Sequence, residues 1–196
     1  MSESKIVILD GVPGGGKTTI TEYFKNEGAH VVPELVEHSL VNKEDNFNYY
    51  IISDLIKMSI ASLARFRGNN VVMDRGPIST LAFTYAHDKI YGTKRYDELL
   101  KIYKHEFSKN TDSKYILNFL FYIDLETSLK RKNRSLTDNR TDSWFYKPFL
   151  EVFFDYYKNI DLHSSKFESV LGEIIVIKKN TSLDQSIEKI HKNFIS

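Results

Sequence analysis

The chain has 196 residues, of which 41% are hydrophobic and 27% are charged, and its formal net charge is +1. A chain of this length and composition is expected to form a single domain, residues 1–196, with a buried core. The balanced charge excludes a protein that binds nucleic acid through a broad basic face. The absence of cysteine excludes disulfides, thiolate nucleophiles and cysteine-based zinc sites.

Residues 1–5 are polar and lead directly into an apolar run, which leaves no room for a signal peptide. No apolar run approaches the roughly 20 residues that a membrane-spanning helix needs. We therefore expect a cytoplasmic protein that has no membrane partner.

Short apolar runs alternate along the chain with longer amphipathic segments. The short runs predict strands at residues 5–10, 29–33, 71–73, 115–123 and 173–177. Helical spacing of apolar residues predicts helices at 18–26, 47–66, 77–91, 95–107, 125–132, 143–160 and 183–194. Because the strand runs are apolar at successive positions, they indicate a parallel sheet that is covered on both faces. The predicted fold class is therefore α/β, with a five-stranded parallel sheet sandwiched by helices.

Polar residues follow several of these strands. In open sheets of this kind, ligands bind at the carboxyl ends of the strands. The residues at those ends are 11–18, Glu34, Asp74, Arg75 and Asp124. We expect the chemistry of the protein to lie among them.

Residues 11–18 read Gly-Val-Pro-Gly-Gly-Gly-Lys-Thr, which satisfies the G-x-x-x-x-G-K-[ST] pattern of a phosphate-binding loop, or P-loop. Backbone N–H groups that turn inward around phosphate oxygens leave no room for side chains, which explains the glycines. Lys17 is expected to reach the β- and γ-phosphates of ATP, and Thr18 to give its hydroxyl to Mg²⁺. The predicted nucleotide-binding residues are Gly11, Gly14, Gly15, Gly16, Lys17, Thr18 and Thr19.

A second candidate follows the third predicted strand. Asp74 stands at its end, where P-loop proteins hold Mg²⁺ or the water around it. Arg75 is the next residue, and we expect it to grip a phosphate or to orient the acceptor. Asp74 and Thr18 are thus the predicted metal ligands.

Residues 74–83, Asp-Arg-Gly-Pro-Ile-Ser-Thr-Leu-Ala-Phe, are similar to the DR(Y)xxSSxAY segment of thymidylate kinases. The matching positions are Asp74, Arg75, Ser79 and Ala82, with Thr80 in place of the second Ser and Phe83 in place of the aromatic residue. Residues 121–131 look like the strand and helix that lead into the lid of that family, and 142–157 resemble the helix after it. The resemblance covers roughly half of the chain. It implies the P-loop NTPase fold in its nucleotide-kinase form, with ATP and Mg²⁺ as cofactors.

The sequence departs from that family in two places. Thr84 stands where thymidylate kinases carry a Gln or Asn that reads thymine. Residues 32–37, Val-Pro-Glu-Leu-Val-Glu, replace an Arg-Glu-Pro-Gly segment that grips the acceptor phosphate, and they contain no arginine. A Pro-Glu pair after this strand is also similar to deoxynucleoside kinases and other small-molecule P-loop kinases, where a carboxylate faces an acceptor hydroxyl. The acceptor group is therefore left open between a hydroxyl and a phosphate.

Glu34 is the candidate general base. A kinase that acts on a hydroxyl needs a carboxylate within hydrogen-bond reach of the departing proton, and Glu34 lies at the expected edge of the sheet, with Glu37 as its substitute. A surface acid in a loop is the alternative. The predicted substrate-binding residues are Glu34, Arg75, Ser79, Phe83 and Thr84.

Three of the seven arginines of the chain, Arg131, Arg134 and Arg140, lie within ten residues of one another. Planar guanidinium groups match the equatorial oxygens of a phosphoryl group in transfer. We expect residues 133–142 to form a short mobile lid that closes over ATP and excludes water. Arg134 and Arg140 are the preferred catalytic arginines, and a solvated charged loop is the alternative.

Several aromatic residues are candidates for stacking on a substrate ring, with core packing as the alternative: Tyr49, Tyr50, Phe83 and Tyr85. Residues 42–45 match the N-K-x-D pattern with which GTPases read guanine, but they precede a long helix instead of following a late strand. We therefore expect Asp45 or Asn46 to cap that helix.

These patterns together predict an ATP- and Mg²⁺-dependent phosphotransferase that acts on a nucleoside or nucleoside monophosphate. The predicted catalytic residues are Lys17, Glu34, Asp74, Arg75, Arg134 and Arg140. Two alternatives stay open, a kinase of another metabolite or antibiotic hydroxyl, and a nucleotide-dependent switch or ATPase that transfers nothing. The expected partner is a small molecule and not a nucleic acid, and a homodimer is left open.

Overall fold

The computed structural model describes residues 4–35, 38, 40–41, 46–110, 112–139 and 142–195. Five parallel strands form one sheet in the order β2-β3-β1-β4-β5. Their bounds are β1 Ile6–Gly11, β2 His30–Val32, β3 Val71–Asp74, β4 Ile116–Phe121 and β5 Glu173–Ile177. The predicted five-stranded parallel sheet is confirmed.

Strand β1 lies at the centre of the sheet, between β3 and β4. Ile6 is in register with Val71 of β3 and with Ile116 of β4. All six residues of β1 and of β4 are buried, because helices cover both faces of the sheet. The P-loop therefore follows the strand that is best fixed by its neighbours.

Successive residues of the central strands point to opposite faces, and each face has its own core. The larger core takes the side chains of Ile6, Ile8, Val71, Met73, Ile116 and Leu120. The smaller core takes those of Val7, Leu9, Val72, Leu117, Phe119 and Phe121. This strict alternation has the period of two that a pleated strand imposes.

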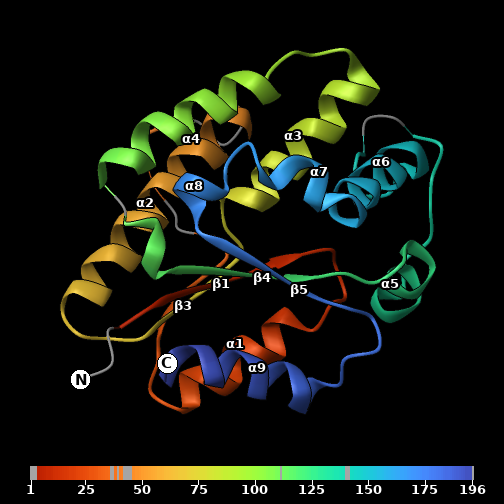
Figure 1. Ribbon diagram of the computed structural model, residues 1–196. Helices are drawn as coiled ribbons and strands as arrows, with labels where there is room; N and C mark the ends of the chain where they lie inside the picture. Colours follow the sequence, from red (N-terminus) through yellow and green to blue (C-terminus); the bar gives the residue numbers. More distant parts are fainter. Residues whose placement is uncertain are drawn as a thin grey trace.

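Two helices cover the smaller core, and most of the others cover the larger one (Figure 1). On the first face lie α1 Lys17–Asn26 and α9 Leu183–Ile195. On the second lie α2 Asn46–Phe66, α3 Pro77–Tyr91, α4 Tyr96–Asn110, α6 Lys147–Lys158, α7 Ile160–Ser164 and α8 Glu168–Leu171. Strand β4 is preceded by a 3₁₀ turn, η1 Ser113–Tyr115, and followed by helix α5 Leu125–Lys132. Within the described part of the chain, no helix is both long and apolar enough to span a membrane.

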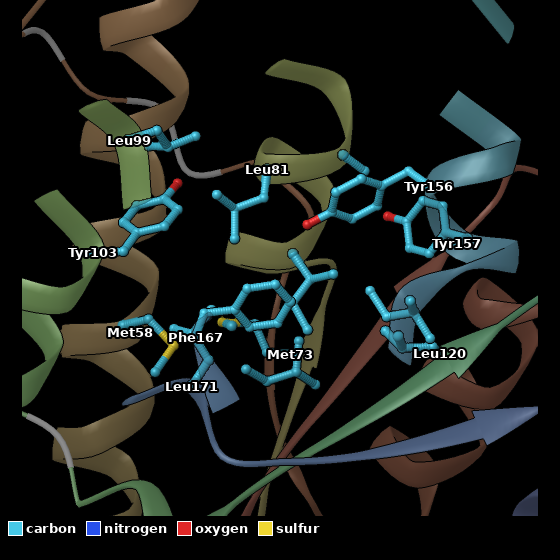
Figure 2. Close-up of a cluster of buried hydrophobic side chains, with 14 of the residues drawn as sticks. Met58, Met73, Leu81, Leu99, Tyr103, Leu120, Tyr156, Tyr157, Phe167 and Leu171 are labelled. Carbon is cyan, nitrogen blue, oxygen red and sulfur yellow. The ribbon is translucent and has the colours of Figure 1, made fainter. Parts of the chain in front are cut away.

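Figure 2 shows how tyrosines from α4 and α6 lie in the larger core, beside Leu81 of α3. Tyr103, Tyr156 and Tyr157 are each at most 2% exposed. Their hydroxyls need hydrogen-bond partners at such depth, and those of Tyr103 and Tyr157 find them on carboxylates of the functional site described below.

The predicted helix 143–160 is shorter than expected. Residues 143–145 form a turn, and α6 runs from Lys147 to Lys158 with a proline in its first turn. Proline fixes the start there because it lacks the N–H that a preceding turn would use. Helices α7 and α8 were missed by the sequence analysis because they have only 5 and 4 residues, too few to show a period.

Candidate active site

The P-loop connects β1 to α1, and three of its glycines adopt conformations that other residues avoid. Gly11, Gly14 and Gly16 have φ angles of 119°, 77° and 93°. A side chain at Gly11 would also meet the backbone of Phe121, since a Cβ atom there would lie 2.2 Å from its carbonyl oxygen. Backbone conformation favours glycine at all three positions, and close approach also requires it at Gly11.

The loop is held from outside by β4 and α5. The amide of Val12 donates to the Phe121 carbonyl at 3.1 Å, the hydroxyl of Ser128 donates to the Pro13 carbonyl at 2.8 Å, and Arg131 donates to the Gly14 carbonyl at 3.0 Å. The last two bonds use carbonyl oxygens of the loop, whereas the first uses the N–H of Val12. An anion in the loop would be bound by other backbone N–H groups.

Lys17 is buried at the start of α1, and its Nζ donates to the carbonyls of Gly11 and Val12 at 3.1 and 2.9 Å. Burial, together with the positive charge of Arg75, lowers the pKa of the Lys17 ammonium to about 7. Gly16 at the N-cap supplies no side-chain cap, and Thr18 and Thr19 are exposed. This helix start is therefore open to an anion.

Asp10, at the end of β1, is a site residue that the sequence analysis missed. Its side chain is fully buried. The carboxylate accepts from the amides of Gly11, Gly76 and Ser79 at 2.9, 3.2 and 3.1 Å. It also accepts from the hydroxyls of Ser79 and Tyr157. One carboxylate thereby joins the P-loop, the start of α3 and helix α6.

Arg75 turns the chain from β3 into α3 and points back to the P-loop. Its φ of 57° lies in the left-handed region, at a cost of about 1–2 kcal/mol for a residue with a Cβ atom. Its guanidinium donates to the Gly11 carbonyl at 3.2 Å and to the Ser79 hydroxyl at 3.3 Å. Its Nε lies 2.5 Å from Oε1 of Glu34. A strained residue with such contacts is typical of a functional site.

Asp74 lies beside this ion pair. Burial raises the pKa of its carboxyl group above the ordinary value, and the negative charge of Glu34 raises it further. One carboxylate oxygen, Oδ1, is buried and has no hydrogen-bond partner among the described residues. A buried carboxylate oxygen without a donor is a candidate ligand for a cation.

Lys57 of α2 is a second residue that the sequence analysis missed. Its side chain is 1% exposed. The Nζ atom donates to the backbone carbonyls of Glu34, Asp74 and Arg75 at 2.9, 3.0 and 2.7 Å. Burial lowers the pKa of this ammonium, although the nearby carboxylates, Asp54 first among them, raise it. All three N–H groups of Lys57 therefore hold the backbone of the three predicted site residues in place.

These elements surround one cavity of about 630 Å³. Beside the P-loop it is lined by residues 14–19, Glu34, Asp74 and Arg75. Elsewhere it is lined mainly by α2, α3 and aromatic side chains: Tyr50, Ser53, Asp54, Thr80, Phe83, Trp144 and Phe153. Phe83 packs against Trp144 and Phe149, with ring centroids 5.5 and 5.1 Å apart. A planar ligand thus has both a polar and an aromatic wall.

The predicted lid residues are only partly brought to this cavity. Arg131 and Arg134 line it, and Arg134 also lies over the ring of Phe145, with its Cζ 5.3 Å from the centroid. The amide of Thr137 donates to the Phe145 carbonyl at 2.9 Å, which ties the segment to the start of α6. Arg140 and Glu37 lie outside the described residues, as does Asp45.

Two other predicted residues, Ser79 and Thr84, have mainly structural contacts. Ser79 lines the cavity, but its hydroxyl contacts Asp10 and Arg75. Thr84 is buried, does not line the described cavity, and donates to the Thr80 carbonyl at 2.8 Å. The structure thus places Thr80, one turn earlier, where Thr84 was expected.

Asp124 ends the loop after β4 and caps α5. It accepts from the amide of Thr127 at 2.8 Å and pairs with Lys179. These contacts hold the pKa of the Asp124 carboxyl well below its usual range. Asp124 does not line the described cavity, so its place is structural. Of the stacking candidates, Tyr50 and Phe83 line the cavity, and Tyr49 is buried at 5% exposure.

No family model matches the chain. It is 28% identical over 168 residues to a thymidylate kinase of Buchnera aphidicola subsp. Baizongia pistaciae, an alignment that covers 70% of this chain and 74% of that protein. The structure of deoxyadenosine kinase from M. mycoides with bound dATP matches 98% of this chain and 100% of its own, with a TM-score of 0.62 and 17% identity. The fold is that of P-loop nucleoside and nucleotide kinases. A thymidylate kinase structure from Candida albicans, with a TM-score of 0.56 and 15% identity, matches 98% of this chain and 92% of its own.

Replacing Lys57 by methionine should destabilise the protein by about 3 kcal/mol, because three carbonyl groups lose a charged donor at once. The matched control is Lys101→Met on the exposed face of α4, which should change stability by less than about 0.5 kcal/mol. Urea unfolding followed by circular dichroism measures both. Equal effects of the two substitutions would contradict the role of Lys57.

Proposed function

We propose that this protein is an ATP- and Mg²⁺-dependent phosphotransferase whose acceptor is a nucleoside or nucleoside monophosphate. One observation carries the proposal: the P-loop, Glu34, Asp74 and Arg75 line the same cavity, next to an aromatic wall. A nucleotide kinase needs these two compartments side by side, one for phosphates and one for a flat ring. The similar proteins, named as kinases of thymidylate and of deoxyadenosine, support it.

The residues present fit the magnesium ion that this chemistry requires. Asp74 offers a buried oxygen without a partner among the described residues, and the exposed Thr18 offers a hydroxyl at the start of α1. Mg²⁺ usually takes one or two protein oxygens and completes its shell with phosphates and water. When bound, it would neutralise charge on the β- and γ-phosphates.

The P-loop and Lys17 would hold the triphosphate. Backbone amides of the loop would bind phosphate oxygens, and Lys17 Nζ needs only to exchange its carbonyl acceptors at Gly11 and Val12 for phosphate oxygens. Arg131 and Arg134 approach the same loop from α5 and the segment after it. These groups would stabilise the negative charge that spreads over the phosphoryl group during transfer.

The charges at the acceptor side favour a hydroxyl as the attacking group. Arg75 is paired with Glu34, and Lys57 uses its three N–H groups on backbone carbonyls. Either cation would have to give up these partners to bind the two negative charges of an acceptor phosphate. Glu34, by contrast, has an exposed carboxylate at the cavity, which would take the proton of a hydroxyl while the new P–O bond forms and ADP leaves.

Replacing Lys17 by alanine should abolish phosphoryl transfer and leave the fold intact, because the side chain of Lys17 donates to the P-loop carbonyls of Gly11 and Val12 and does not join distant elements through them. A screen of nucleosides and monophosphates with Mg²⁺ and ATP, read as ADP release and as phosphorylated product, measures this. Lys25→Ala on the exposed face of α1 is the control and should retain activity. Transfer by the Lys17 variant, or hydrolysis of ATP that no acceptor accelerates, would refute the proposal.

Replacing Glu34 by glutamine should slow transfer to a nucleoside by about 10²–10⁴-fold, the usual contribution of a general base. Binding of ATP, followed by fluorescence or calorimetry, should change little. Glu27→Gln serves as the control, since Glu27 is exposed at the end of α1. If the variant instead keeps its full rate and a monophosphate is the better acceptor, then the acceptor group is a phosphate.

Binding of ATP should take up close to one proton near pH 8. The free protein holds Lys17 largely neutral there, since its pKa is about 7, and phosphate oxygens favour the charged form. Affinity should therefore fall as the pH rises above 7, by up to about tenfold per unit for a single linked proton. Calorimetry in HEPES and in Tris gives the number of protons. Lys17→Arg, which cannot titrate, should show no uptake; wild-type binding without uptake would contradict the prediction.

A further inference from the structure

Two polar side chains of α2 lie deep in the wall of the cavity, away from the P-loop. Ser53 and Asp54 both line the cavity, and they are only 2% and 5% exposed. They stand one turn before Lys57 on the same helix, and it is Lys57 that bonds to the backbone of Glu34 and Asp74. Neither residue has a part in phosphate binding as described above.

The Asp54 carboxylate is oriented by two donors behind it. Thr80 Oγ1 and Tyr103 OH each donate to Oδ2 at 2.6 Å. Burial raises the pKa of Asp54, and the charge of Lys57 and these two hydrogen bonds lower it. Because both donors end on Oδ2, the other oxygen, Oδ1, is not used by them. The side chain therefore presents an oxygen acceptor in a fixed direction.

Ser53 adds a hydroxyl group, which can donate a hydrogen bond where the Asp54 carboxylate can only accept. Its hydroxyl is buried and has no hydrogen-bond partner among the described residues. A buried hydroxyl without a partner costs about 1–3 kcal/mol, and a serine that lines a cavity can recover this from a ligand. The wall thus offers an acceptor at Asp54 next to a hydroxyl that donates or accepts at Ser53.

Aromatic side chains give the same cavity an apolar surface on which a ligand ring could pack. Phe83 is three residues after Thr80 on α3, and Thr80 is the residue that holds Asp54. Phe83 and Phe153 line the cavity together with Trp144. A ring that packs on these side chains would share the cavity with Ser53 and Asp54.

We propose that Asp54 and Ser53 read the base of the acceptor and select bases with an exocyclic amino group over thymine and uracil. The carboxylate accepts the amino N–H, and the Ser53 hydroxyl donates to the neighbouring ring nitrogen of adenine or cytosine. Guanine offers two adjacent donors to the same pair. Thymine and uracil instead place carbonyl oxygens on both sides of their one ring N–H, and those oxygens would face the carboxylate. This inference rests on the proposed function and names its substrate class.

The test compares deoxyadenosine, deoxycytidine, deoxyguanosine and thymidine, and their monophosphates, as acceptors for the whole protein with saturating ATP and Mg²⁺. At least one amino base should exceed thymidine about tenfold or more in kcat/KM, since a site that hydrogen-bonds one pattern rejects its opposite strongly. Asp54→Asn adds an N–H donor at the same volume. It should reduce this ratio at least about tenfold, because an amide N–H can bond a thymine carbonyl.

Ser53→Ala provides a second measurement that does not depend on the fate of Asp54. Ser53 has no described partner to lose, so the variant should fold, and it should raise the KM of the preferred amino base several-fold without raising that of thymidine. The matched controls are Asp97→Asn and Ser59→Ala, both at exposed positions, and they should keep the wild-type ratio.

Thymidine or thymidylate as the best acceptor of the wild type would overturn the assignment while leaving the proposed function standing. An unchanged base ratio in both Asp54→Asn and Ser53→Ala would overturn it equally. If no nucleoside or monophosphate accepts a phosphoryl group although ATP binds, both proposals fail, and the calorimetric binding of ATP distinguishes that case from an inactive preparation.

Discussion

The arrangement of the cavity depends on the buried carboxylate of Asp10. Three backbone amides and two hydroxyls converge on it, from the P-loop, from the start of α3 and from α6. A charge at that depth is tolerated only because so many donors surround it. Asp10 also fixes relative positions, since Gly11 begins the P-loop and Gly76 follows the strained turn at Arg75. Loss of this carboxylate would remove the acceptor shared by five donors and the hydrogen bonds through which it joins three elements.

Lys57 performs the complementary task with the opposite charge. Asp10 gathers N–H groups at the end of β1, whereas Lys57 gathers carbonyl groups from the segments that follow β2 and β3. Strand β2 has only three residues and lies at the edge of the sheet. Its own hydrogen bonds therefore leave the position of Glu34 weakly defined. The ammonium group supplies the missing constraint, and the ion pair between Glu34 and Arg75 has a fixed backbone on both sides.

The parts of this site that could be predicted from sequence are those in which neighbouring residues act together. The P-loop is a continuous segment, and the Asp74–Arg75 pair stands at the end of a strand. The order of neighbouring residues is therefore enough to recognise both. Asp10 and Lys57 act on residues 66 and 17 positions away along the chain. In the sequence, Asp10 is the last polar residue of a strand, and Lys57 interrupts the apolar spacing of a long helix. A lysine on an otherwise buried helical face is a signal that was available, but its partners are defined only by the fold. Thr84 was assigned to the site by resemblance to thymidylate kinases, which carry a Gln or Asn there. Only the fold shows that its hydroxyl donates to the Thr80 carbonyl.

Most polar groups of the cavity are satisfied by one another before any ligand binds. Lys17 is bonded to the P-loop carbonyls, Arg75 to Glu34, and Asp54 to Thr80 and Tyr103. Binding of a ligand would therefore exchange existing partners for new ones, and the geometry would already be present when the exchange occurs, which is the condition for strong electrostatic stabilisation of a transition state. Two cavity groups outside these pairs, Asp74 Oδ1 and Ser53 Oγ, have no hydrogen-bond partner among the described residues. In the proposals above, the first would bind a cation and the second the base of the acceptor, so the protein keeps unused hydrogen-bonding capacity for both proposed ligands.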